Sequence, residues 1–133
     1  MIDGQFPLAS WFLLVSATGF LAVYALPLLL VPLRWARWFR WEAPSGPTDL
    51  TVYFGRCLGA VAVAITWVAL AAAPDPEHNL IVFDLIAIAC GLQTLIHVDG
   101  AVRRIQPWTE TLEIGLYAVL CGGAVAIRVL LLT

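Results

Sequence analysis

The sequence predicts an all-α fold, namely an integral membrane four-helix bundle in which neighbouring helices are antiparallel. Its 133 residues are 62% hydrophobic and only 12% charged, about half the charge of a typical soluble domain. The mean hydropathy is +0.91. Four apolar stretches approach or exceed the ~20 residues that cross a bilayer. Because the connections between them are short, we expect a single domain over residues 1–133 whose consecutive helices pack side by side.

The first apolar stretch is the longest of the four. No charged residue lies between Gly4 and Leu33, which predicts a membrane helix over about residues 8–31. Pro27 should kink this helix near its end, and Pro32 should help to end it. The stretch is too long for a signal peptide and has no basic segment before it, so we expect it to be retained.

Arginine and tryptophan alternate after the first helix. The residues are Arg34, Trp35, Arg37, Trp38, Arg40 and Trp41. Tryptophan favours the membrane–water interface, and arginine reaches lipid phosphates from there. This pattern predicts a lipid-facing interfacial helix over about residues 33–41, ended by the PSGP stretch at residues 44–47. The alternative is a docking site for an anionic lipid or for an acidic partner.

Three further helices are predicted, over about residues 49–73, 80–101 and 108–132. Thr48 or Asp49 could cap the start of the second helix. That helix also holds Gly55 and Gly59 at GxxxG spacing, which permits close approach of another helix.

The arginines predict the orientation of the chain. Five of them lie in the connections between the first and second and between the third and fourth helices, and none lies between the second and third. The positive-inside rule therefore places these two arginine-bearing connections in the cytoplasm. We expect a multi-pass protein of a bacterial inner membrane with both termini outside.

Ionisable residues within the predicted helices divide into two groups by depth. An ionisable side chain at mid-bilayer costs at least ~2.5–3.5 kcal/mol, so it normally faces other helices or a cavity. Asp84 and Arg128 lie ~6 Å inside the outer helix ends, which predicts that they pair. The alternative is that Arg128 alone reaches the outer headgroups.

The second group lies near the cytoplasmic ends of three helices and could form a polar ligand-binding pocket. Its members are Tyr53, Arg56, Gln93, His97, Glu110, Glu113 and Tyr117. Gln93 and His97 share one helix face, and the last three residues form a stripe on another helix. We expect Arg56 to pair with Glu113, because Arg56 is the nearest permanently charged cation.

The chemistry of such a pocket has several interpretations. It could be a hydrogen-bond network that holds helix register, or it could transfer protons to a lipophilic substrate. His97 could also ligate haem or a chlorin magnesium, but without a second axial candidate it predicts neither a metal site nor a particular cofactor. No CxxC, HExxH, GxSxG, P-loop or Rossmann motif occurs. No basic run indicates nucleic-acid binding.

Three short motifs resemble a known family over about residues 53–100. They are Arg56-x-x-Gly59, His78-Asn79, and the segment from Gly91 to His97. They are similar to motifs of the four-helix family of the small endoplasmic-reticulum scaffold in ergosterol biosynthesis. That family's acidic residue after the late histidine has only Asp99 as a counterpart, and its members lack the Trp/Arg segment. DoxX-like and sterol-isomerase-like proteins have similar outlines.

The resemblance implies a non-enzymatic tether for membrane enzymes. We therefore expect a non-catalytic accessory or scaffold subunit of a larger membrane assembly, with other integral membrane proteins and lipids as partners. The alternative is a small lipophile-binding protein, an isomerase, or a pigment- or haem-binding subunit that uses the cytoplasmic-side polar pocket.

Overall fold

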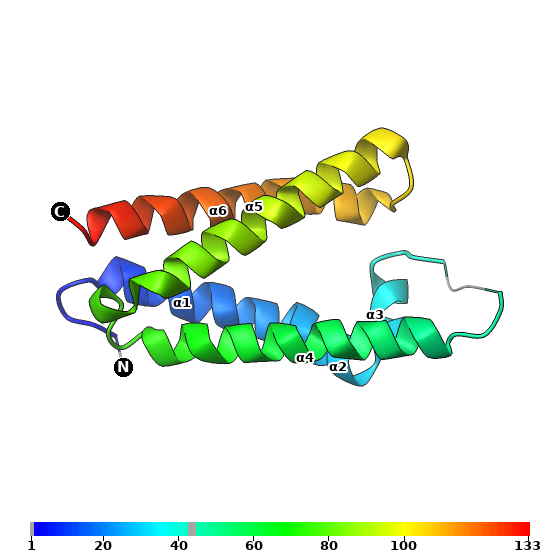
Figure 1. Cartoon of the computed structure of the whole chain (residues 1–133), viewed down its shortest axis with the longest axis horizontal. Helices are drawn as coiled ribbons and strands as arrows, with labels where there is room; N and C mark the ends of the chain where they lie inside the picture. Colours follow the sequence, from blue (N-terminus) through cyan, green and yellow to red (C-terminus); the bar gives the residue numbers. More distant parts are fainter. Residues whose placement is uncertain (1, 43–44) are drawn as a thin grey trace. The chain divides into compact units, whose positions relative to one another are not determined.

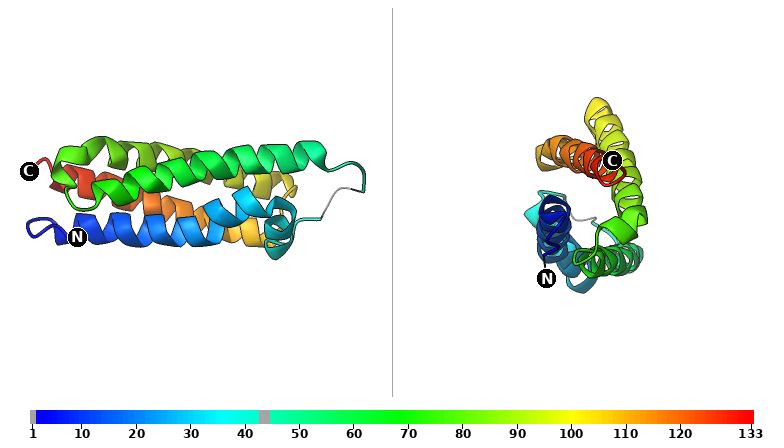
Figure 2. Two further views of the ribbon diagram at one scale, coloured as in Figure 1. Left: turned by 90° about the horizontal axis from the view of Figure 1, so that it is seen from below. Right: turned by 90° about the vertical axis from the view of Figure 1, so that its left-hand side faces the viewer.

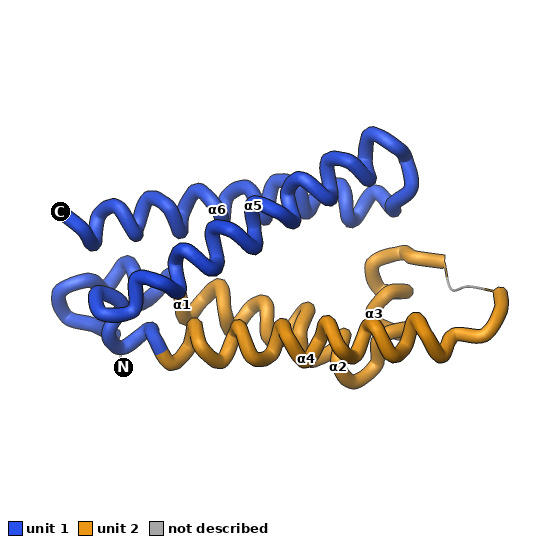
Figure 3. Tube along the Cα trace, in the orientation of Figure 1, with its two compact units in different colours: residues 1–12, 72–133 blue, residues 13–71 orange. Residues whose placement is uncertain are grey.

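The structure, a computed structural model, describes residues 2–42 and 45–133 (Figure 1). These residues contain helices and no strand. Four helical spans are long and apolar enough to cross a membrane: Pro7–Leu30, Asp49–Ala72, Glu77–Arg103 and Trp108–Leu130. The all-α class and the four membrane-length helices are therefore confirmed. The chain divides into two compact units, residues 1–12 with 72–133 (unit 1) and residues 13–71 (unit 2) (Figure 3).

The first span contains a π-helical turn. Helix α1 (Pro7–Phe20) leads into this turn (Leu21–Ala25), which is followed by α2 (Leu26–Leu30). The N–H of Leu26 bonds the carbonyl of Leu21, one residue further back than in an α-helix. Pro27 lacks an N–H and crowds the carbonyl four residues earlier, so a regular α-helix is unfavourable here. The irregularity expected at Pro27 is this π turn.

Helix α3 (Pro32–Trp38) begins where the first span ends. Val31 leaves helical geometry at φ −137° and ψ 55°, and Pro32 then occupies the first helical position, which proline favours. The interfacial helix expected over residues 33–41 is shorter than predicted, because Arg40 takes a left-handed conformation with φ 65°. The terminator predicted at residues 44–47 begins at Pro44, outside the described residues.

Helix α4 (Asp49–Ala72) packs closely on α2 and α3 within unit 2. A Cβ added at Gly59 would lie 2.6 Å from the Cα of Leu29, and one at Gly55 would lie 2.7 Å from the Cβ of Pro32. Only glycine permits these approaches. The expectation that the GxxxG spacing allows close helix packing is confirmed.

Unit 1 is built on an antiparallel hairpin of α5 (Leu80–Arg103) and α6 (Trp108–Leu130), which run side by side (Figures 1 and 2). A short 3₁₀ turn (Glu77–Asn79) precedes α5. Helix α5 extends two residues past its predicted end and stops where Arg104 adopts a left-handed conformation, φ 56°. The N–H of Ile105 then bonds the carbonyl of Gly100 at 3.1 Å, as in a Schellman motif. This reversal brings the start of α6 beside the end of α5.

The first residues of α1 belong to the same unit and pack near the other end of the hairpin. Phe12 stacks with Phe83 at a centroid distance of 6.3 Å, and Phe83 is fully buried. The hydroxyl of Ser10 donates to the carbonyl of Ala73 at 2.6 Å. These contacts join segments that are distant in sequence, so they stabilise the unit beyond its local helix propensity.

Candidate functional site

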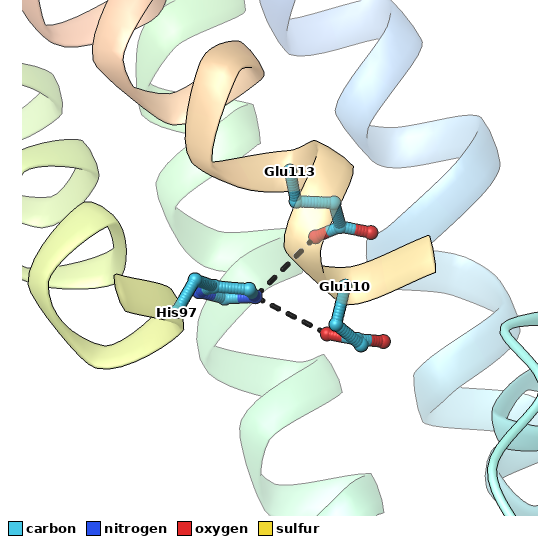
Figure 4. Close-up of side chains that lie close together, drawn as sticks. All are labelled: His97, Glu110 and Glu113. Carbon is cyan, nitrogen blue, oxygen red and sulfur yellow. Dashed lines mark hydrogen bonds and ion pairs between the residues drawn. The ribbon is translucent and has the colours of Figure 1, made fainter. Parts of the chain in front are cut away.

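A buried cluster of His97, Glu110 and Glu113 lies within the α5–α6 hairpin (Figure 4). Nε2 of His97 is 3.1 Å from Oε2 of Glu110 and 3.6 Å from Oε2 of Glu113. The exposed fractions of the three side chains are only 7–9%. Figure 4 shows His97 reaching from α5 toward both carboxylates on α6.

Local helix geometry places the three side chains. His97 lies ~9 Å before the end of α5, and Glu110 and Glu113 lie ~3 and ~7.5 Å after the start of α6. The two glutamates are three residues apart, so they share a helix face. Because the turn between the helices is short, the cluster lies at matching heights on both. Glu110 is also in the first turn of α6.

The orientation of the His97 ring follows from one backbone contact. Nδ1 lies 2.7 Å from the carbonyl oxygen of Gln93. A carbonyl can only accept a hydrogen bond, so Nδ1 carries the proton that is donated. Nε2 therefore faces the carboxylates either as the donor of an imidazolium or with a free lone pair. At 3.1 Å, Glu110 is within hydrogen-bond distance of a protonated Nε2, whereas 3.6 Å to Glu113 is too long for a hydrogen bond.

Gln106 supports the cluster, although it is not among the predicted pocket residues. Its Nε2 donates to the carbonyl of His97 at 3.0 Å and to the hydroxyl of Thr111 at 3.2 Å. The amide rests against Gly100, where an added Cβ would lie 2.8 Å from Cδ of Gln106. The available signal in the sequence was a polar side chain just beyond the end of a helix.

Four of the seven predicted pocket residues come together in unit 1. They are His97, Glu110, Glu113 and Tyr117, whose buried ring lies 5.1 Å from that of His97. Gln93 contributes its backbone carbonyl. Tyr53 and Arg56 are exposed on α4 in unit 2. The expected Arg56–Glu113 pair would join residues of different units and stays a prediction.

Asp84 and Arg128 form an ion pair toward the other end of the hairpin, as predicted. The two side chains are each 34% exposed. The alternative in which Arg128 reaches headgroups alone is not what the structure shows. The pair links α5 to α6 far from the cluster.

Unit 2 contains a half-open cavity of about 390 Å³ between α2, α3 and the start of α4. Its lining is mostly apolar and includes Leu28, Pro32, Trp35, Arg37, Trp41 and Gly55. Three of these belong to the Trp/Arg segment that was predicted to face lipid. The cavity therefore lies at the segment with the highest density of arginine.

Trp35 is buried within unit 2, and its place relative to the lipid interface stays a prediction. It is 8% exposed and packs on Tyr24 and Phe39 at centroid distances of 4.6 and 4.8 Å. Its Nε1–H donates to the carbonyl of Val23 at 3.1 Å. Pro27 has no N–H to offer that carbonyl, so the indole supplies the donor. Trp38, by contrast, is 59% exposed.

No protein-family model, curated protein or solved structure matches the chain. The resemblance to the ergosterol scaffold family therefore stays a hypothesis. Two features of the chain bear on its function, the His97–Glu110–Glu113 cluster and the cavity of unit 2.

Proposed function

We propose that the protein is a multi-pass membrane protein of the bacterial inner membrane that binds an anionic phospholipid in the cavity of unit 2. The cavity carries this proposal, because its volume of about 390 Å³ falls within the ~300–1,000 Å³ usual for small-molecule sites. Its apolar lining suits an acyl chain. The four membrane-length helices support the membrane location.

The charge around the cavity favours an anionic headgroup. Arg37 lines the cavity, and Arg34 and Arg40 lie three residues away on either side. Glu42, which also lines it, is the only acidic residue in residues 31–42, so the segment carries a net charge of about +2. A basic residue near an anionic membrane surface contributes ~1 kcal/mol to attraction, which makes phosphatidylglycerol a better fit than a zwitterionic lipid.

The test measures the lipid that remains bound. The protein is reconstituted in nanodiscs of mixed phosphatidylglycerol and phosphatidylcholine, gently extracted, and examined by native mass spectrometry. We expect retained phosphatidylglycerol, reduced about fivefold in Arg37→Gln, which corresponds to ~1 kcal/mol. Ala36→Phe, which fills the cavity, should also release it. Arg103→Gln is the matched control, since Arg103 is an exposed arginine of unit 1. Equal loss in Arg103→Gln, or no retained lipid, would contradict the proposal.

A role as a non-catalytic accessory or scaffold subunit is the second candidate. It is favoured by the layout of the described residues, which hold only helices and short connections and no separate extramembrane domain. A partner would therefore have to bind largely along membrane helices. Gentle purification from native membranes, followed by native mass spectrometry, should then yield a membrane protein at fixed stoichiometry. Elution alone with bound lipid would exclude this role.

A further inference from the structure

We propose that His97, Glu110 and Glu113 bind a divalent first-row transition-metal ion, for which Zn²⁺ is the reference probe. The site lies in unit 1 and shares no residue with the lipid cavity, so the two proposals stand independently. The donor types, their spacing and the orientation of the imidazole support this assignment.

The donor set suits such an ion. Imidazole nitrogen and carboxylate oxygen are regular ligands of Zn²⁺, and imidazole also suits Fe²⁺, Cu²⁺ and Ni²⁺. Mg²⁺ and Ca²⁺ prefer oxygen alone, so the histidine makes them a poorer fit. Three protein ligands are also the usual number in sites that leave a coordination position open for water or another small ligand.

The spacing fits coordination. Bonds of 2.0–2.2 Å at tetrahedral or octahedral angles place neighbouring donor atoms ~2.8–3.6 Å apart. Nε2 of His97 lies 3.1 Å from Oε2 of Glu110 and 3.6 Å from Oε2 of Glu113. All three donor atoms lie within 4.8 Å of one another. Small rotations of the carboxylates would bring all three donor atoms into the spacing that coordination requires.

Neighbouring groups hold the His97 imidazole in the orientation that metal coordination requires. A metal-binding histidine commonly donates its other ring N–H to a backbone carbonyl or carboxylate, which fixes the ring and the tautomer. Nδ1 of His97 makes this contact with the carbonyl of Gln93 at 2.7 Å, leaving Nε2 directed at the two glutamates. Gln106 bonds the carbonyl of His97 at 3.0 Å and so anchors the same turn of α5.

The test titrates the full-length protein in detergent with Zn²⁺ alone. The protein carries an affinity tag without histidine and is first stripped with a chelator. Calorimetry and elemental analysis should show one ion bound per chain. Co²⁺ substitution should give a visible spectrum with nitrogen and oxygen ligands and no thiolate band, which separates this site from Cys57, Cys90 and Cys121.

Three variants locate the ion. His97→Ala and Glu113→Gln should each weaken Zn²⁺ binding by more than about 100-fold, beyond the 10–100-fold that loss of an outer-shell partner causes. Glu113→Gln preserves shape, so circular dichroism should show a folded protein even if His97→Ala unfolds. His78→Gln is the matched control: it removes the chain's other histidine, which lies exposed beside Asp75, and should bind Zn²⁺ like the wild type.

Two results would overturn the proposal. One is the absence of stoichiometric Zn²⁺ or Co²⁺ binding by the folded wild-type protein, which would leave the cluster as a hydrogen-bond network between α5 and α6. The other is unchanged binding in folded Glu113→Gln, or loss of binding in His78→Gln, which would place the ion elsewhere.

Discussion

At the residue level, Gln106 adds a hydrogen bond to the carbonyl of His97 near the end of α5 and also bonds the first turn of α6. We expect Gln106→Leu to lower the free energy of unfolding by ~1–2 kcal/mol, because two hydrogen bonds of ~1 kcal/mol each are lost. Thermal unfolding in detergent measures this. Asp99→Asn is the control, since it breaks only the exposed Asp99–Arg103 pair, which should be worth ~0–1 kcal/mol. A smaller effect for Gln106→Leu than for Asp99→Asn would contradict the assignment.

The loop before α5 offers a second prediction at this scale. The hydrogen bond from His78 holds the pKa of Asp75 below its usual value of 3.8. A depressed carboxyl pKa contributes stability that is present above pH 3.8 and is lost as the pH falls through the lowered value. His78→Gln should therefore raise the pKa of Asp75 toward 3.8, measured by carbon NMR of the carboxyl group. Glu77→Gln should leave it unchanged, and the same shift in both variants would refute the His78 contact as cause.

At the scale of helices, Gly59 sets how closely α4 approaches α2. A Cβ there would meet the Leu29 backbone at 2.6 Å, and a helix backbone cannot move aside as a side chain can. We expect Gly59→Ala to destabilise the protein by ~1–3 kcal/mol, the usual cost of overpacking. Gly19→Ala is the matched control, because nothing lies within 4 Å of its Cβ position. Thermal unfolding of the Gly59→Ala and Gly19→Ala variants in detergent measures this difference. Equal melting temperatures for the two variants would be evidence against close packing.

The Asp84–Arg128 pair couples α5 to α6 and yields a prediction for a double-mutant cycle. A single substitution leaves one charge unpaired in a poorly solvated site, which costs ~3–5 kcal/mol when burial is complete. The cost should be smaller here, because each side chain is 34% exposed. Asp84→Leu and Arg128→Leu should each lower stability in detergent, and the double variant should recover part of the loss. Strict additivity would show that the two charges act independently.

At the scale of the whole molecule, the distribution of arginine predicts the topology. Arg34, Arg37 and Arg40 in one connection and Arg103 and Arg104 in another should stay in the cytoplasm, with the Asp75 loop outside. In a background whose three cysteines are replaced, Asp75→Cys should react with a membrane-impermeant reagent in intact cells. Glu42→Cys, on the arginine-rich side, should react only after permeabilisation. The reverse pattern would invert the whole orientation.

The helices and their approximate ends could be predicted because their causes are local. Apolar runs and prolines predicted four membrane-length helices, and each end lies within about two residues of the expected one. Asp84 and Arg128 could be paired from depth alone, because they lie at matching heights on helices joined by a short turn. Gly55 and Gly59 likewise predicted close packing from their spacing.

Which side chains meet depends on how the helices pack. The positions of Arg56, His97 and Glu113 along their helices placed all three near one end. The direction in which each side chain points depends on the rotation of its helix about its own axis, which apolar composition does not determine. Glu113 faces His97 because the left-handed Arg104 sets the turn of the hairpin. Trp35 is buried because Pro27 leaves the Val23 carbonyl without its usual donor. The helices could be predicted from the sequence because they depend on neighbouring residues. The cluster and the cavity could not, because they depend on contacts between residues that are distant in the sequence.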